Sequence, residues 1–591
     1  MEHELITLGI LFFFAIIGGI LATKFRQPAV IGLLLVGAII GPHSLNFVRD
    51  EEMISLMAEF GAILLLFVIG LEFVIPKLSK IGFKAMLIAV LKMGIIFFLT
   101  YETCIFMDLN NTAALVLGVM LSISSTVVIV KILESKGLYN REEMPLLIGI
   151  LIVEDVIAVA VLTFLAGAVN NTSILNSIEQ LIIAVTILII AYLIMLIVAR
   201  IVVSWFISNS GDEGVTFVAL GLCAGFSYLA HSLGLSAATG AFLAGSVVAS
   251  LPQARLFEHA IRPYTLTFTA LFFISMGTMV NFQSINENIP FLFVIVTLIV
   301  VSRFLAVGFI NYLFANFSKD QTIFSSIAFI SIGEFSVLIA QQAAPLNLGI
   351  DIVSIAAFIV FTTAIIMSLS INHYSKVTDL LESKYPRTYM SKPKSLSKFI
   401  KLLFDEIDIE NSNTRQFKRL FFRTLLHFNF TLFIIIGWHR AISAINHSAS
   451  LYATLYIYIV TLIFIVVATG FIYKLVRNTT KLYSSLLVIV SNLDASCDFK
   501  RTKNILNNLL IAILLFICAL TSPFLTVVFS LPSWTKIIPV VLLLLVILRV
   551  NSILRAVQGF HKSREVFPEY RKLSEVYMLK QRTEPTPCPR K

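Results

Sequence analysis

Long apolar stretches recur along this chain of 591 residues and constrain its fold more than any other feature. A helix needs about 20 mostly apolar residues to cross the hydrocarbon core of a bilayer. Apolar residues make up 58% of the sequence and charged residues 13%, a balance that excludes an ordinary water-soluble protein. Inside a bilayer the backbone polar groups must be satisfied without water, which helices achieve within one segment. We therefore expect an all-α polytopic membrane protein.

Thirteen of these stretches lie between Leu5 and Asn372. We predict spans at residues 5–23, 28–41, 53–74, 82–107, 112–133, 145–168, 177–198, 214–233, 235–251, 264–282, 290–316, 321–344 and 351–372. Lys and Arg gather in alternate connections between the spans, and the opposite connections are acidic or neutral. The preference of basic loops for the inner side predicts an N-terminus outside the cell and a cytoplasmic chain from Ser375 onward.

Charge divides the chain into a membrane domain and a basic C-terminal annex. Residues 1–373 hold 15 Lys and Arg against 22 Asp and Glu, whereas residues 374–591 hold 29 against 12. Within the annex we predict a basic cytoplasmic or interfacial linker (374–427), two transmembrane hairpins made of four apolar segments (428–556) and a basic cytoplasmic tail (557–591). The basic amphipathic stretches of the linker could lie on anionic lipid or remain solvated, and the sequence favours neither.

Two adjacent acids, Glu154 and Asp155, lie in the middle of the sixth predicted span. A charge at the centre of a bilayer helix costs at least a few kcal/mol, so a charged residue there usually has a function. A carboxylate there can hold a proton or a small cation, but not easily both, and that competition is the minimum chemistry of cation/proton exchange. The structural alternative is that a proton or a salt bridge neutralises these carboxylates, although one partner does not easily neutralise two adjacent acids.

Polar residues also interrupt the fifth and twelfth spans at similar depth. The fifth contains a cluster of hydroxyl residues that includes Ser125 and Thr126, and the twelfth contains Glu334 next to a glycine. If the spans form inverted repeats, these two correspond, and broken helices there would turn carbonyls and helix ends toward an ion. Oxygen ligands of these kinds suit hard cations. For each segment alone, the alternative is close packing of small residues between helices.

Arg303 lies near the centre of the eleventh span. Because arginine does not deprotonate in proteins, it must meet an anion or an aqueous cavity. We expect Glu154 or Glu334 to be its partner, which leaves Asp155 to bind the proton; the opposite assignment, with Glu154 free and Asp155 paired, stays open. Charged residues nearer the span ends or on long side chains, Lys92 among them, are predicted to be anchors or local pairs.

Seven segments resemble the monovalent cation:proton antiporters of the Kef and Nap type, the second branch of the cation:proton antiporter superfamily. They are PAVIGLLLVGAIIGP (28–42), FVIGLEF (67–73), LSISSTVVIVKIL (121–133), IVEDVIAV (152–159), GLSAATGAFLAG (234–245), FFISMGTMV (272–280) and GEFSVLI (333–339). The resemblance covers about residues 1–375 in order and at natural spacing. The GEFS and GAFLAG motifs are specific when they occur together with the acid pair.

The resemblance implies a thirteen-helix inverted repeat, normally a homodimer, with broken crossing helices 5 and 12. It further implies a core domain of helices 4–6 and 11–13 that moves like an elevator against a dimerisation domain containing helices 1–3 and 8–10. By motif, Asp155 matches the aspartate that binds the cation and the proton. Arg303 matches the basic residue of the eleventh helix, and Ser125 and Thr126 fall in the unwound crossing.

The chain departs from the family pattern at two places. Glu154 stands where the family commonly has Asp, Asn or Gln, which leaves the stoichiometry and the choice of ion open. The annex also lacks the GxGxxG turn of a nucleotide-binding domain. The five cysteines lie far apart without CxxC spacing. We therefore expect no cofactor, no resident metal centre and no nucleic-acid partner.

These observations favour a secondary transporter, not an enzyme, that exchanges Na⁺ or K⁺ for H⁺ across the plasma membrane by alternating access. Asp155, assisted by Glu154, would bind the cation or the proton, and Arg303 and Glu334 would compensate charge. Two alternatives stay open. One is a gated, channel-like potassium efflux system, and the other is a transport-like membrane sensor or scaffold whose basic annex binds lipid or a partner.

Overall fold

In the part of the chain that the computed structural model describes, every regular element is a helix, and short turns and extended segments connect the helices. It describes residues 2–169, 214–384, 453–492, 499–528 and 538–565 with short gaps at 26, 49–50, 73–74, 234–236, 252–253 and 347, and scattered residues at 187–196 and 416–427. Two compact units are present. The first comprises Met1–Tyr312, Phe317–Lys384 and Val527–Ser530, and the second comprises the remaining residues.

Seven helical segments among the described residues, one of them interrupted at residues 123–125, are long and apolar enough to cross a membrane. They are Ile6–Lys24, Lys84–Phe106, Asn111–Ser135, Met144–Leu162, Gly214–Ser232, Ile289–Ala315 and Ile352–Leu380. Shorter apolar helices, such as Ala29–Ile40 and Ala237–Ala249, lie between them in the sequence. The expected all-α membrane class is therefore confirmed. The count of thirteen spans stays a prediction, since most of the predicted span 177–198 lies outside the described residues.

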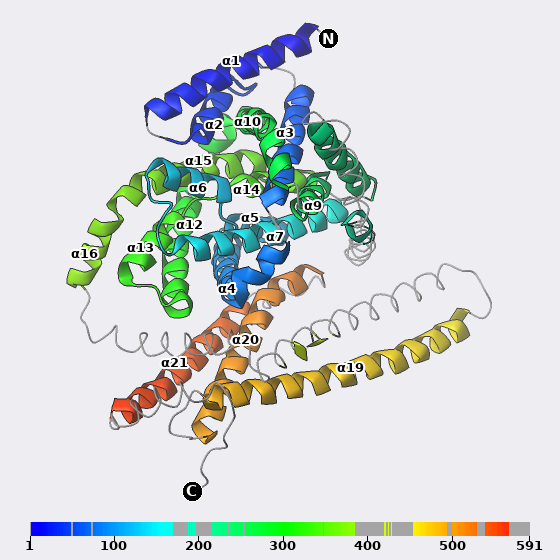
Figure 1. Ribbon diagram of the computed structural model, residues 1–591, viewed down its shortest axis with the longest axis vertical. Helices are drawn as coiled ribbons and strands as arrows, with labels where there is room; N and C mark the ends of the chain where they lie inside the picture. The colour runs from blue at the N-terminus through cyan, green and yellow to red at the C-terminus, as the bar shows by residue number, and fades with distance from the viewer. Residues whose placement is uncertain are drawn as a thin grey trace. The chain divides into compact units, whose positions relative to one another are not determined.

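Five helices of the first unit pack into one group. They are α1 (Glu2–Lys24), α2 (Ala29–Ile40), α3 (Glu51–Glu72), α9 (Ala237–Ala249) and α10 (Ala254–Thr278). Within this group α2 packs against α1 and α10, and α3 packs against α9 and α10 (Figure 1). The helix α10 is therefore the element that both α2 and α3 share.

The backbones of α3 and α9 touch at two glycines, Gly70 and Gly245. A Cβ atom built on Gly245 would overlap the carbonyl oxygen of Phe67, and one built on Gly70 would overlap that of Phe242. The helices α2 and α10 meet through a glycine pair in the same way. In a bilayer, where lipid is as apolar as the side chains, such close backbone approach is a main source of helix association.

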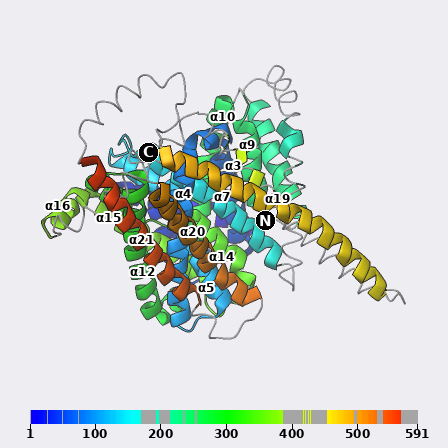
Figure 2. The same ribbon diagram turned by 90° about the horizontal axis from the view of Figure 1, so that it is seen from below.

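A second group of helices in the same unit surrounds the polar residues singled out in the sequence. It consists of α4 (Ile75–Phe106), α5 (Asn111–Ser122), α6 (Thr126–Ser135), α7 (Met144–Val169), α12 (Ile289–Ile310), α13 (Lys319–Ala328), α14 (Glu334–Ala343) and α15 (Ile352–Ser370). The helix α4 contacts α5, α7 and α12, and α14 contacts α5, α7 and α15 (Figures 1 and 2).

Side-chain caps fix where several of these helices begin. The Asn110 side chain accepts a hydrogen bond of 2.6 Å from the amide of Ala113 at the start of α5. Ser318 and Gln321 form a reciprocal capping box at the start of α13. Such caps satisfy backbone N–H groups that have no partner inside the helix.

The second unit contains α19 (Ala453–Asn492), α21 (Ile538–Glu565) and most of α20 (Phe499–Val528). Polar contacts join these helices to one another. The hydroxyl of Tyr483 donates to Asn507 at 2.6 Å, and Arg549 donates to Asn508 at 3.1 Å. The two predicted transmembrane hairpins stay a prediction, because residues 428–452 and 529–537 lie outside the described part of the chain.

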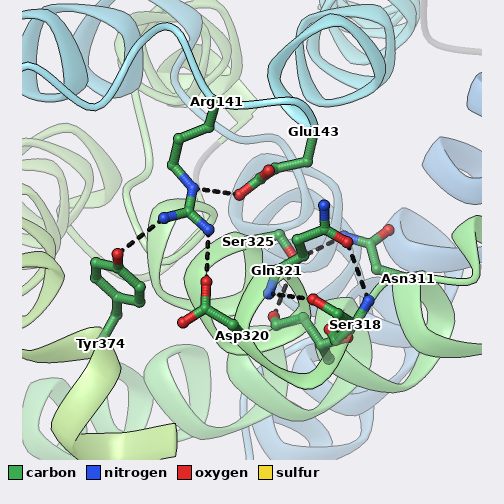
Figure 3. A network of polar contacts seen from close by, with 9 residues as sticks. Arg141, Glu143, Asn311, Ser318, Asp320, Gln321, Ser325 and Tyr374 are labelled. Carbon is green, nitrogen blue, oxygen red and sulfur yellow. Dashed lines mark hydrogen bonds and ion pairs between the residues drawn. The ribbon is translucent and has the colours of Figure 1, made fainter.

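Arg141, in the connection between α6 and α7, ties three segments of the first unit together (Figure 3). Its guanidinium donates to Glu143 at 2.5 Å, to Asp320 in the first turn of α13 at 2.6 Å, and to the hydroxyl of Tyr374 at 2.8 Å. Tyr374 begins α16 (Tyr374–Lys384). The guanidinium also lies 4.3 Å from the ring centroid of Phe324. One side chain thereby links α13, α16 and the approach to α7.

The environment of Arg141 acts on its pKa in two directions. Burial alone would lower the pKa, but the hydrogen bonds with Asp320 and Glu143 outweigh it and hold the pKa of Arg141 above its ordinary value. The guanidinium is therefore permanently charged. Its planar group donates several hydrogen bonds at once, which the ammonium of a lysine could not do in the same geometry.

Gly245→Ala is expected to lower the thermal stability of the protein, because the added methyl group would collide with the backbone of α3. Overpacking of this kind costs about 1–3 kcal/mol. Gly225→Ala is the matched control, since a Cβ atom there meets nothing within 4 Å and alanine favours helix. Thermal unfolding of the purified protein in detergent measures both. Equal melting temperatures for the two variants would contradict the close contact.

Arg141→Met is expected to lower the free energy of unfolding by about 2 kcal/mol, and with it the melting temperature, because it removes hydrogen bonds to two carboxylates. Lys131→Met is the control. Lys131 also pairs with an acid, Glu134 at 3.2 Å, but both side chains of that pair are exposed, and exposed pairs contribute little. A melting temperature of Arg141→Met no lower than that of Lys131→Met would show that Arg141 does not hold these segments together.

Candidate functional site

Two non-helical segments meet in the middle of the second helix group. Residues 123–125 separate α5 from α6, and residues 329–333 separate α13 from α14. The amide of Ser125 donates to the carbonyl of Ser331 at 3.2 Å, and the hydroxyl of Ser336 donates to the carbonyl of Met120 at 2.8 Å. The two interruptions are therefore in direct contact, although about 200 residues separate them in the sequence.

Arg303 satisfies the carbonyl groups that these interruptions expose. Helix ends leave carbonyls without partners inside the helix, and those groups carry partial negative charge. The Arg303 guanidinium reaches the carbonyls of Leu121 at 2.8 Å and Ile123 at 2.6 Å, where α5 ends. It also reaches the carbonyl of Phe329 at 2.8 Å, where α13 ends. Arg303 itself is fully buried and projects from α12.

Three carboxylates lie near the starts of the following helices, where the partial charge is positive. Glu154 accepts a hydrogen bond of 2.8 Å from the amide of Ser124, and Asp155 accepts one of 2.8 Å from the hydroxyl of Thr126, the first residue of α6. Glu334, the first residue of α14, accepts one of 2.9 Å from the hydroxyl of Ser125. All three acids are at most 3% exposed.

The structure brings together every residue that the sequence analysis predicted for the site. Glu154 and Asp155 come from α7, Ser125 and Thr126 from the first interruption and the start of α6, Glu334 from α14, and Arg303 from α12. The roles assigned to these residues stay predictions. Their position at the contact between the two interruptions is what the structure adds.

The partner of Arg303 differs from our expectation. We expected Glu154 or Glu334, but within the described residues the hydrogen bonds of Arg303 go to three backbone carbonyls and to the hydroxyl of Ser124. The physical reason is that the ends of two helices supply carbonyl oxygens that have no partner inside the helix, and these oxygens accept the hydrogen bonds of the guanidinium. The carboxylate of Glu154 is instead occupied by a second basic residue.

That second basic residue is Lys92, which we predicted to be an anchor or a local pair and which is neither. It is 1% exposed, and its ammonium forms an ion pair with Glu154, which lies 62 residues away in the sequence. The ammonium also donates to the hydroxyl of Ser124 at 2.6 Å and lies 4.9 Å from the ring centroid of Phe329. The position of Lys92 inside an apolar run was the available signal, the same one that revealed Glu154.

The arrangement provides hard oxygen ligands at the centre of the helix group, with three acidic and two basic side chains. Carboxylate, hydroxyl and carbonyl oxygens are the ligands that alkali cations prefer. One carboxylate oxygen of Glu334 is buried and accepts no hydrogen bond among the described residues. Polar groups and charges gathered at interrupted helices are typical of the binding sites of secondary transporters.

Comparison with known proteins places the chain within this class. The family described as "Sodium/hydrogen exchanger, transmembrane" matches residues 10–377. The chain therefore belongs to the sodium/hydrogen exchanger family, as the resemblance of its motifs indicated.

Individual relatives support the assignment. A protein described as a Na⁺/H⁺ antiporter from Enterococcus hirae is 29% identical over 337 residues, which cover 56% of this chain and 87% of that protein. K⁺ efflux antiporter 5 from Arabidopsis thaliana is 28% identical over 340 residues, which cover 56% of this chain and 60% of that protein. The matched residues make up little more than half of this chain.

A solved structure shares the fold. The sodium proton antiporter MjNhaP1 from Methanocaldococcus jannaschii, determined at pH 8, aligns with a TM-score of 0.50 and 18% sequence identity. The alignment covers 64% of this chain and 98% of that structure.

Arg303→Met is expected to destabilise the protein strongly, because it leaves three buried carbonyls without donors. Each such group costs about 1–3 kcal/mol. Arg303→Lys is expected to fall between the parent and the methionine variant, since an ammonium keeps the charge but not the fork of donors. Thermal unfolding in detergent gives the order. A methionine variant as stable as the parent would show that Arg303 does not hold the interruptions together.

Proposed function

We propose that this chain is a secondary transporter that exchanges a monovalent cation, Na⁺ or K⁺, for H⁺ at the site formed by Asp155 and its neighbours. The observation that carries the proposal is the burial of Glu154 and Asp155 against the first helix interruption. Buried acids in a membrane helix are costly and mark ion or proton pathways. Membership of the sodium/hydrogen exchanger family supports the same chemistry.

Asp155 is the proposed binding group for both transported species. Its carboxylate would hold the cation in one state and a proton in the other, so that each displaces its competitor. Thr126, which donates to Asp155 at 2.8 Å, and Ser125 would add hydroxyl oxygens at the start of α6. Glu154 would assist by adding negative charge next to Asp155. No covalent chemistry is required, so we propose no enzymatic activity and no cofactor.

Arg303 and Glu334 are the proposed charge-compensating residues. Arg303 offsets the negative ends of α5 and α13, and Glu334 lies at the positive start of α14. A transported cation would then enter a site whose helix ends are already compensated. Because Lys92 pairs with Glu154, the charge of Asp155 is the one proposed to attract the cation.

The proposed architecture is a thirteen-helix inverted repeat that works as a homodimer in the plasma membrane. The contact between the α5/α6 and α13/α14 interruptions supports two related halves that cross at their centres. In this arrangement the N-terminus lies outside the cell and the chain after Ser375 lies in the cytoplasm. The basic linker at 374–427, most of which lies outside the described residues, would contact anionic lipid.

Asp155→Asn is expected to abolish cation/proton exchange without unfolding the protein, because the amide cannot release a proton to make way for a cation. Proteoliposomes containing the parent or the variant are given an internal acid pool, and the collapse of the pH gradient is followed on addition of Na⁺, K⁺ or Li⁺. The parent should respond to at least one cation and the variant to none.

Glu134→Gln provides the matched control. Glu134 lies on α6, is exposed, and undergoes the same change from carboxyl to amide. Exchange by this control at the parent rate would assign the loss to Asp155. Normal exchange by Asp155→Asn would remove Asp155 from the mechanism. Absence of any cation response by the parent would favour a channel or a sensor instead.

A further inference from the structure

Lys92 occupies a position that links both helix interruptions to the acid pair. It projects from α4, forms an ion pair with Glu154 of α7, and donates to the hydroxyl of Ser124 in the first interruption. The ring of Phe329, in the second interruption, lies against its ammonium. A buried lysine is costly unless its charge is paired and its donors are used, and both conditions hold here.

The two acids of the pair have different surroundings. Both oxygens of Glu154 are engaged, one by the ammonium of Lys92 and the other by the amide of Ser124 at 2.8 Å. Asp155 instead faces the hydroxyl of Thr126 at the start of α6. The geometry therefore holds the Glu154 carboxylate between the ammonium of Lys92 and a backbone donor. The charge of Lys92 also acts on Asp155, which accepts a hydrogen bond from Thr126.

The buried charges of the site can be counted. Among the described residues of the site five charged side chains are at most 3% exposed, and they are Lys92, Glu154, Asp155, Arg303 and Glu334. Glu143 is equally buried, but it lies before the start of α7 and pairs with Arg141. Three of the five are acidic and two are basic, so the set carries one net negative charge when all five are ionised. One transported cation or one proton is enough to neutralise it.

We propose that Lys92 is a positioning residue that holds Glu154 as a fixed anion, so that the protein exchanges one cation for one proton and moves no net charge. This inference rests on the proposed function, and it adds the ratio of cations to protons exchanged in each cycle. Without Lys92 the same set would carry two net negative charges. A cation-loaded and a doubly protonated carrier would then differ in charge, and turnover would move charge across the membrane.

Two readouts on the same proteoliposomes test the proposal. A pH-sensitive dye reports proton movement after a pulse of Na⁺ or K⁺, and a voltage-sensitive dye reports the membrane potential that a sustained current would build up. For the parent we expect proton movement without a sustained current. For Lys92→Met we expect slower exchange, by about tenfold, since an unpaired buried carboxylate is left behind, together with a sustained current. Lys92→Arg keeps the charge and should stay without current.

A double variant keeps the test decisive if Lys92→Met is inactive. Lys92→Met with Glu154→Gln restores one net negative charge, so it should exchange faster than Lys92→Met and again without sustained current. A folded double variant that exchanges no protons would overturn the proposal, because Glu154 would then be more than a fixed anion. A Lys92→Met variant that exchanges without current would overturn it as well.

The outcomes for the parent separate this inference from the proposed function. Proton movement accompanied by a proportional current would overturn the one-to-one stoichiometry and leave exchange itself intact. No cation-driven proton movement by the parent would overturn both.

Discussion

The contact of Arg303 with two helix ends is the interaction on which the site depends. An interruption within a spanning helix leaves carbonyls in a medium without water, and each unsatisfied group there costs several kcal/mol. Arg303 meets carbonyls from both interruptions with one rigid, permanently charged group. The interruptions can therefore exist at the centre of the helix group. They present Ser125 to Glu334 of α14 and Thr126 to Asp155 of α7.

The signs of the charges around the interruptions follow the helix dipoles. The basic side chain of Arg303 lies where α5 and α13 end, and the acids lie near the starts of α6 and α14. Lys92 is the exception, because its ammonium is directed to a side-chain carboxylate. Backbone polarity thus explains the sign of the charge at Arg303 and at Glu334. It does not explain the ion pair of Lys92 with Glu154, which joins two side chains.

Much of the site was predictable from the sequence because charges in apolar runs are rare. Their position inside apolar runs identified Glu154, Asp155, Arg303 and Glu334, and the structure places all four at one location. The pairings were not predictable, since pairing depends on distances between helices that the pattern of residue types along the chain does not reveal. Lys92 was missed because a long side chain in a span was assumed to reach the interface. The all-α class followed from length and hydropathy, but the span count did not, because several helices are too short to decide it.

The two helix groups of the first unit are held by different physical interactions, and the difference bears on transport. The helices α3 and α9 touch through backbone atoms at glycines, a dispersion contact that has one good geometry and is lost by small shifts. The site is held by hydrogen bonds and ion pairs, whose polar atoms can change partners at low cost if a new partner of the right charge arrives. In the proposed mechanism a transported cation is such a partner for Asp155. In the proposed exchange mechanism the glycine-packed helices would remain a fixed frame, and the polar contact between the interruptions would be where the protein changes state.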